Sequence, residues 1–268
     1  MKIEPDVVCG SSIGALVGGS YVAGHLDKLE EWLVTLDRLD VVKFFDLSLI
    51  KGGLIAGKRI IEFFRERFGD FEIDSLAKPY GAVATDLMSG EEIWIRSGSL
   101  LDAVRASISI PGVFEPFFLN ERWFIDGGVV NPVPVTLCRA LGADRVIAVD
   151  VNGCIAEELS CTQSGGTHTN ANWKSALNTE APLKYSTAVP DSPGTLPSTE
   201  QSEGRKKPGL FHVIHNSIYF MQKTITQTRL AFEPPEIALC PDICDIGFMD
   251  FHEAEKVIAD GRECVRKN

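Results

Sequence analysis

The sequence predicts an α/β domain built on a mainly parallel sheet. Short apolar runs such as ADRVIAVDV have the Val- and Ile-rich character of strands buried on both faces. Between these runs lie segments in which apolar residues recur every three or four positions, as they do along amphipathic helices. The resulting order of strand, helix and strand is typical of a parallel sheet covered by helices on both faces.

Periodicity and turn residues define the elements of the first part of the chain. A strand is predicted at residues 6–9, where it meets a glycine- and serine-rich turn, and two more strands are predicted at 81–85 and 92–96 around the turn at 86–90. Helices are predicted in four segments, 15–24, 26–39, 59–68 and 100–110, the last of which Pro111 ends.

The second part repeats the pattern with one interruption. A strand at 122–126, a helix at 135–142 and a strand at 143–151 are followed by a helix at 210–232, a short strand at 236–241 and a helix at 250–265. Residues 154–209 are dominated by Ser, Thr, Asn, Gln, Gly and Pro, which predicts a flexible insertion. Since the segment after it is too short to form its own core, we expect a single domain over residues 1–268.

Charge and composition exclude several classes of partner. Acidic residues outnumber basic ones by 37 to 26, and the net charge of −11 argues against binding nucleic acid. Seven scattered cysteines indicate reduced thiols and a cytoplasmic location, and no run of about 18 apolar residues marks a membrane span. Any membrane contact would be peripheral, at the inner membrane surface, and would use the helix predicted at 210–232. The favoured interpretation of that helix is that it is buried in the protein.

One pentapeptide could carry a nucleophile. Gly10-Ser11-Ser12-Ile13-Gly14 fits the pattern G-x-S-x-G at the point where the first strand turns into the first helix. Such a turn lifts the hydroxyl of Ser12 from the strand end, and the helix that follows directs the Ile13 amide toward a developing oxyanion. A purely structural turn of small residues explains the same pentapeptide, so the residues alone leave both interpretations open.

A nucleophilic serine needs a base, and two arrangements could supply one. Asp126 closes a predicted strand and is followed by Gly127 and Gly128, so its carboxylate could accept the serine proton directly; a simple Asp-Gly turn cap is the alternative. A histidine triad would instead use Asp150 with one of three late histidines, which are His212, His215 and His252. Cys240 and Cys244 lack a second ligand pair, and we expect no metal and no cofactor.

Together these residues resemble the patatin-like phospholipase family, and in particular its compact bacterial members. Residues 10–14 are similar to the family's nucleophile elbow, and residues 126–128 to its Asp-Gly-[Ala/Gly] element. Further similar blocks are ASISIPGVFEP, NPVPV, GLIAGKRI, AVATDLMSGE and MDFHEAEKVIADG. The resemblance extends over most of residues 6–152 and 210–264.

The resemblance implies a three-layer α/β/α sandwich and a serine–aspartate acyl hydrolase. In that role Ser12 would be the nucleophile and Asp126 the base, acting on carboxylic ester bonds of lipids as a phospholipase, lysophospholipase or esterase. Its partner would be a lipid or another acyl ester. Phe114, Phe117 and Phe118 could line an acyl channel, although ordinary core packing is the favoured interpretation.

One departure from the family pattern concerns the oxyanion hole. The family carries a glycine-rich loop after a strand upstream of the elbow, whereas only nine residues precede Gly10 here. We therefore expect this chain to lack the family's first strand and that loop. The alternative to an active hydrolase is a truncated, weakly active or inactive module that binds lipid or protein.

Overall fold

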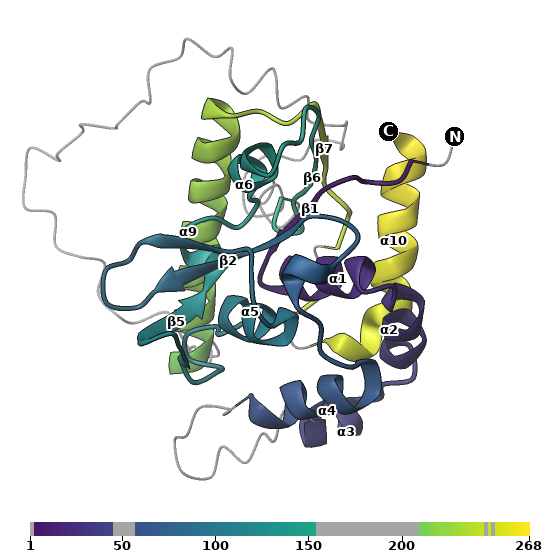
Figure 1. Cartoon of the computed structure of the whole chain (residues 1–268). Helices are drawn as coiled ribbons and strands as arrows, with labels where there is room; N and C mark the ends of the chain where they lie inside the picture. The colour runs from purple at the N-terminus through teal and green to yellow at the C-terminus, as the bar shows by residue number, and fades with distance from the viewer. Residues whose placement is uncertain (1–2, 45–56, 154–208, 244–245, 248–249) are drawn as a thin grey trace, which may run out of the picture.

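The computed structural model describes residues 3–44, 57–153, 209–243, 246–247 and 250–268 (Figure 1). Of the predicted flexible insertion at 154–209, all but residue 209 lies outside these described residues. The β-strands are β1 (Val8–Ser11), β2 (Tyr80–Asp86), β3 (Glu92–Ile95), β4 (Phe117–Leu119), β5 (Arg122–Asp126), β6 (Ile147–Val149) and β7 (Ile237–Leu239).

Helices lie between groups of these strands and after the last one. The α-helices are α1 (Ile13–Val22), α2 (Leu26–Leu33), α3 (Arg38–Phe44), α4 (Lys58–Phe68), α5 (Leu100–Ser107), α6 (Val135–Ala140), α9 (Leu210–Phe232) and α10 (Ala254–Lys267). Short 3₁₀ turns are η2 (Ile73–Ser75), η3 (Gly127–Val129) and η4 (Phe251–Glu253).

The strand β2 organises the main sheet, because three other strands pair with it. One edge of β2 pairs with β3. On its other edge, residues 80–83 of β2 pair with β1, and residues 84–86 pair with β5. The last residue of β1, Ser11, therefore lies opposite Val83, and the last residue of β5, Asp126, lies opposite the next residue, Ala84. This register brings the ends of β1 and β5 together, although 114 residues separate Ser12 from Asp126.

Helices cover both faces of this sheet, as expected for a three-layer α/β/α sandwich. Tyr80 and Ala82 of β2 pack with Ala15 of α1 and Ala103 of α5 on one face. On the other face, Leu137 of α6 lies against Gly81, and α9 runs behind β2 and β5 (Figure 1). The predicted α/β class and its layered arrangement are confirmed.

Among the described residues, one of the four strand pairs of the main sheet is parallel and three are antiparallel. The pairs β1–β2 and β6–β7 are parallel. In the described part of the chain, β1 pairs with no strand other than β2. The pairs β2–β3, β2–β5 and β4–β5 are antiparallel. The β2–β3 and β4–β5 connections are too short for a parallel crossover, which needs a dozen or more residues.

Two predicted helices are shorter than expected, and one strand was not predicted. Apolar periodicity continues to residue 39, but α2 ends at Leu33 and α3 begins separately at Arg38. The helix predicted at 100–110 ends at Ser107, and the short strand β4 was missed. In the described segments, no helix is long and apolar enough to cross a membrane.

Candidate active site

Ser12 lies at the turn between β1 and α1 with an unusual backbone conformation. Its φ and ψ angles are 53° and −124°, a positive-φ conformation that L-residues other than glycine adopt at an energetic cost. The amide of Ser12 donates to Ser107 Oγ at 2.9 Å, and its carbonyl accepts from the Ala15 amide at 2.9 Å. These bonds hold the turn, so the hydroxyl of Ser12 has a defined direction.

The two glycines of the pentapeptide differ in what surrounds them. A Cβ atom added to Gly10 would lie 2.2 Å from the carbonyl carbon and oxygen of Gly14, because the first turn of α1 folds back onto β1. A Cβ atom added to Gly14 would meet nothing within 4 Å. The close approach of strand and helix at the elbow therefore requires glycine at position 10 and not at position 14.

The Ser12 hydroxyl is directed at Asp126. Ser12 Oγ donates to Asp126 Oδ2 at 2.5 Å, while Asp126 Oδ1 accepts from the Gly128 amide at 2.7 Å. The Asp126 backbone is held too, since its amide donates to the Ser109 carbonyl and its own carbonyl accepts from Thr85 Oγ1. Both carboxylate oxygens thus have a fixed partner, and one of those partners is the serine hydroxyl.

The two glycines after Asp126 allow the turn to pass close to β1 and β2. A Cβ atom on Gly127 would lie 2.1 Å from the Val83 carbonyl oxygen and 2.7 Å from Ser11 Oγ. A Cβ atom on Gly128 would lie 2.9 Å from Asp126 Oδ1, the oxygen that its own amide bonds. Glycine at both positions lets the chain pass close to β1 and β2 and return an amide to the carboxylate.

Burial changes the acidity of Asp126. The residue is 1% exposed, and loss of hydration raises the pKa of its carboxyl from an ordinary value of 3.8 to about 7. Hydrogen bonds from Ser12 and Gly128 favour the ionised form and oppose part of this rise in pKa. A carboxyl with a pKa near 7 is well matched to accepting and returning a proton at neutral pH.

Ser107 is a residue of the site that the sequence did not single out as one. Its hydroxyl accepts from the Ser12 amide and donates to the Val83 carbonyl at 2.6 Å, so it joins the end of α5 to the elbow and to β2. It is fully buried. The only signal in the sequence is its place in the segment ASISIP, which resembles a family block but does not indicate which serine bonds the elbow.

Ile13 follows Ser12 as the first residue of α1, where a helix offers no internal acceptor for the backbone amide. The positive end of the helix dipole adds to the attraction of this terminus for negative charge. The side chain of Ile13 is exposed, which leaves the approach to this end of α1 open.

The structure pairs Ser12 with Asp126 rather than with a histidine. His252, on η4, accepts a hydrogen bond from Arg38 Nε at 2.9 Å. Asp150 accepts from the Asn152 amide at 2.9 Å. His215 lies on α9, and the side chain of His212 is outside the described residues. In the parts of the chain that the structure describes, no three His, Cys, Asp or Glu side chains gather as metal ligands would.

The three phenylalanines proposed for a channel have different environments. Phe114 is buried in the cluster beneath α2 and α4, and Phe117 packs against the buried Phe124. The guanidinium of the buried Arg105 lies over the rings of both. Core packing therefore accounts for Phe114 and Phe117, whereas Phe118 is exposed.

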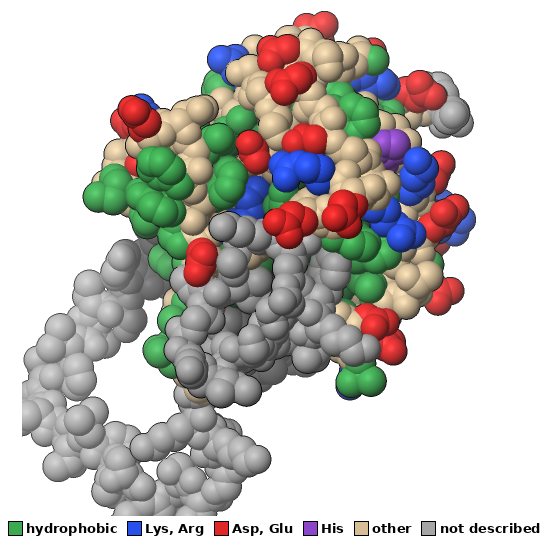
Figure 2. All heavy atoms as spheres, turned by 60° about the horizontal axis from the view of Figure 1, so that its bottom comes forward, with side chains coloured by type: hydrophobic (Ala, Val, Ile, Leu, Met, Phe, Trp, Pro, Cys, Tyr) green, Lys and Arg blue, Asp and Glu red, His purple; other side chains and the backbone are tan. Residues whose placement is uncertain are grey.

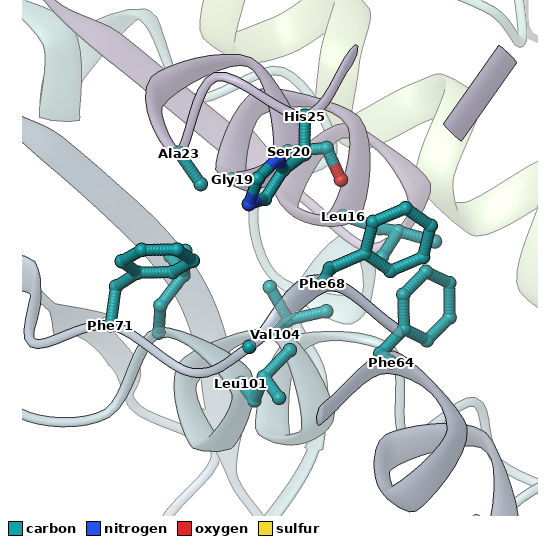
Figure 3. Close-up of a pocket in the computed structure, with 12 residues that line it drawn as sticks. Leu16, Gly19, Ser20, Ala23, His25, Phe64, Phe68, Phe71, Leu101 and Val104 are labelled. Atoms are coloured by element: carbon teal, nitrogen blue, oxygen red, sulfur yellow. The ribbon is translucent and has the colours of Figure 1, made fainter. Parts of the chain in front are cut away.

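An apolar pocket opens beside α1 (Figure 3). Leu16 of α1, Ala23 directly after it, the phenylalanine rings of α4 and Val104 of α5 contribute to its lining. Leu16 follows Ser12 by one helical turn, a rise of about 6 Å along α1. The imidazole of His25 lies near the rings of Phe68 and Phe71, and its Nδ1 is buried without a hydrogen-bond partner among the described residues.

Comparison with known proteins gives consistent matches. The sequence model of the family described as "Patatin-like phospholipase" matches residues 1–139. An uncharacterized NTE family protein of Mycobacterium tuberculosis is 30% identical, over 95% of this chain and 80% of its own length. A patatin-like phospholipase domain-containing protein of Caenorhabditis elegans is 34% identical over 58% of this chain and 12% of its own. The neuropathy target esterase of Drosophila melanogaster is 30% identical over 56% and 11%.

Proposed function

Because the chain belongs to the patatin-like phospholipase family, we propose that it hydrolyses carboxylic ester bonds of lipids, with Ser12 as nucleophile and Asp126 as base. The observation that carries the proposal is the 2.5 Å hydrogen bond from Ser12 Oγ to Asp126 Oδ2. The family match supports a lipid hydrolase, and the geometry supports assigning these two residues to the reaction.

The first half of the reaction forms an acyl-enzyme. Asp126 takes the proton of Ser12 Oγ while that oxygen attacks the ester carbonyl carbon. The resulting oxyanion is stabilised by the Ile13 amide at the start of α1. When the tetrahedral intermediate collapses, the C–O bond to the alcohol breaks, and the leaving alcohol takes the proton from Asp126.

The second half releases the acid. Asp126 accepts a proton from water as that water attacks the acyl carbonyl, and the proton returns to Ser12 Oγ when the bond between serine and the acyl group breaks. No other titratable group is needed, because the Asp126 carboxyl, with its pKa raised to about 7, can exchange a proton in both directions near neutral pH.

Hydrolysis of a short-chain p-nitrophenyl ester tests the proposal. We expect Ser12→Ala to abolish turnover and Asp126→Asn to lower kcat by about 10²–10⁴, the usual contribution of a general base. Ser217→Ala is the matched control, because within the described part of the chain its exposed hydroxyl bonds the carbonyl of Val213 in its own helix and lies outside the proposed site. Turnover that survives in a folded Ser12→Ala variant would overturn the assignment. A folded wild-type chain without turnover that still binds acyl chains would identify a binding module instead.

A further inference from the structure

Four large apolar side chains lie exposed at two neighbouring connections of the sheet. Leu87 and Met88 begin the β2–β3 connection and are 43% and 81% exposed. Phe118 on β4 and Trp123 on β5 are 54% and 45% exposed. These four residues are called the hairpin patch below. In Figure 2, hydrophobic side chains gather at the left, the side on which Figure 1 places β5 and the β2–β3 connection.

Contacts join the two connections into one surface. Phe118 and Trp123 are cross-strand partners, and their ring centroids are 4.9 Å apart. The Leu87 amide donates to the Trp123 carbonyl at 2.8 Å, which places Leu87 directly beside Trp123. The patch is therefore continuous across β2, β5 and β4.

Hydrogen bonds define one connection, and the backbone conformation defines the other. Asp86 Oδ1 accepts from the amides of Met88 and Ser89, at 2.9 Å and 3.1 Å. Asn120 and Glu121, between β4 and β5, both have positive φ, as a tight two-residue hairpin requires. The backbone at the patch is thus held in place while its side chains remain uncovered.

The hairpin patch lies on the same strands as the proposed reacting residues. Trp123 precedes Asp126 by three residues on β5, a distance of about 10 Å at the usual rise of a strand. Leu87 directly follows β2, the strand whose edge aligns the ends of β1 and β5. Because successive side chains of a strand point to opposite faces, Trp123 and Asp126 face opposite sides of the sheet, and the patch lies at the other end of β5 from the Ser12–Asp126 pair.

Shape and charge indicate which kind of partner covers the hairpin patch. The patch occupies protruding connections rather than a groove, and it combines tryptophan, phenylalanine, leucine and methionine, which suit the boundary between water and hydrocarbon. Arg122, next to Trp123 in the chain, lies 3.4 Å from the Asp86 carboxylate, which offsets part of its charge. With a net charge of −11, the whole chain is also repelled by an anionic surface.

We infer that Leu87, Met88, Phe118 and Trp123 dock this protein on the surface of a zwitterionic phospholipid bilayer. The choice of a bilayer rests on the proposed function, since a lipid substrate resides in one. Docking is reversible, because four partly exposed side chains insert less hydrocarbon than a permanent lipid anchor does.

Flotation with phosphatidylcholine vesicles tests the inference. The Ser12→Ala variant is used, so that binding is measured without hydrolysis. We expect it to float with the vesicles, and we expect Met88→Glu in the same background to reduce the bound fraction at least about tenfold, because a carboxylate resists transfer into the interface. Met88 is suited to this change because its side chain is the most exposed of the four. Val265→Glu, at a 62% exposed position on α10, is the matched control and is expected to float normally.

Activity measurements separate this inference from the proposed function. Met88→Glu should keep its turnover of a soluble p-nitrophenyl ester but lose hydrolysis of vesicle lipid. Normal flotation of Met88→Glu, or binding that needs anionic phosphatidylglycerol and disappears in high salt, would overturn the inference. A wild-type chain that floats but hydrolyses nothing would contradict the proposed function and leave the docking surface supported.

Discussion

At the scale of single residues, Asp126 reconciles two opposing requirements. A base must be able to ionise, whereas a carboxylate that is 1% exposed has lost nearly all its hydration. Hydrogen bonds from Ser12 Oγ and the Gly128 amide compensate for only part of that loss, so the pKa is raised to about 7 and not restored to its ordinary value. The proposed base therefore reduces the stability of the folded state at the pH where it works.

The raised pKa of Asp126 predicts how the free energy of unfolding depends on pH. The folded state holds the Asp126 proton up to about pH 7, whereas the unfolded chain releases it near 3.8, so this residue's contribution to folding stability is full below pH 3.8 and is lost as pH rises through 7. Asp126→Asn removes the cost of ionisation. The variant should therefore gain stability relative to the wild type between pH 5 and pH 8, with about 4 kcal/mol as the upper limit.

Denaturant unfolding of both proteins across that pH range checks the prediction. The same ionisation should govern kcat/KM of the wild type, which is expected to rise with pH through about 7, since only ionised Asp126 can accept the serine proton. A stability difference that does not change with pH would show that Asp126 is not perturbed by burial.

At the scale of elements, the elbow depends on the close approach of α1 to β1. That approach leaves no room for a Cβ atom at Gly10, whereas Gly14 faces open space. We predict that Gly10→Ala destabilises the protein by about 3 kcal/mol or more, because backbone atoms must move. Gly14→Ala should be neutral or stabilising by up to about 1 kcal/mol, because alanine favours a helix.

Urea unfolding of the two alanine variants measures this difference directly. The pair is a stringent comparison, since both glycines belong to one pentapeptide and receive the same substitution. Equal losses at the two positions would mean that the helix does not fold back onto the strand as described.

Local patterns in the sequence predicted the parts of the site that are local in the chain. Residues 10–14 and 126–128 each carry a turn signal, and both turns form where they were predicted, at the ends of β1 and β5. What brings them together is the shared edge of β2, which is a matter of register between distant segments. The bond from the Ser12 amide to Ser107, across 95 residues, likewise leaves no signal in either segment.

The missed elements have similar explanations. The strand β4 has only three residues, and it exists because the positive-φ turn at Asn120 and Glu121 returns the chain onto β5. The helix α2 stops at Leu33 although the apolar spacing continues, so packing of the segment after it overrides the periodicity.

At the scale of the whole molecule, Glu92 joins three separate parts of the chain. Its Oε2 accepts from Arg229 of α9 at 2.6 Å, and its Oε1 accepts from Asn131 Nδ2 and Trp94 Nε1, each at 2.7 Å. Asn131, in the loop after η3, is 1% exposed. One carboxylate on β3 thus connects the sheet to α9 and to the segment that follows Asp126.

Removing this junction should weaken the whole fold. We predict that Glu92→Ala lowers the free energy of unfolding by about 2–3 kcal/mol, because the buried Asn131 amide and the Arg229 guanidinium lose an acceptor. Glu91→Ala, at the exposed position next to it, should change stability by less than about 0.5 kcal/mol. Thermal unfolding of both variants decides the matter, and a Glu92→Ala protein as stable as the control would exclude this junction as a stabilising element.

The position of α9 in the chain has a consequence for biosynthesis. The strands of the main sheet and α6 all precede Val149, whereas α9 begins at Leu210, about 60 residues later. A ribosome adding 5–20 residues each second would need about 3–12 s to reach α9. During that interval the sheet can pair and α6 can pack on it, but α9 does not yet cover the face that bears Glu92, and Glu92 has no Arg229 to bond.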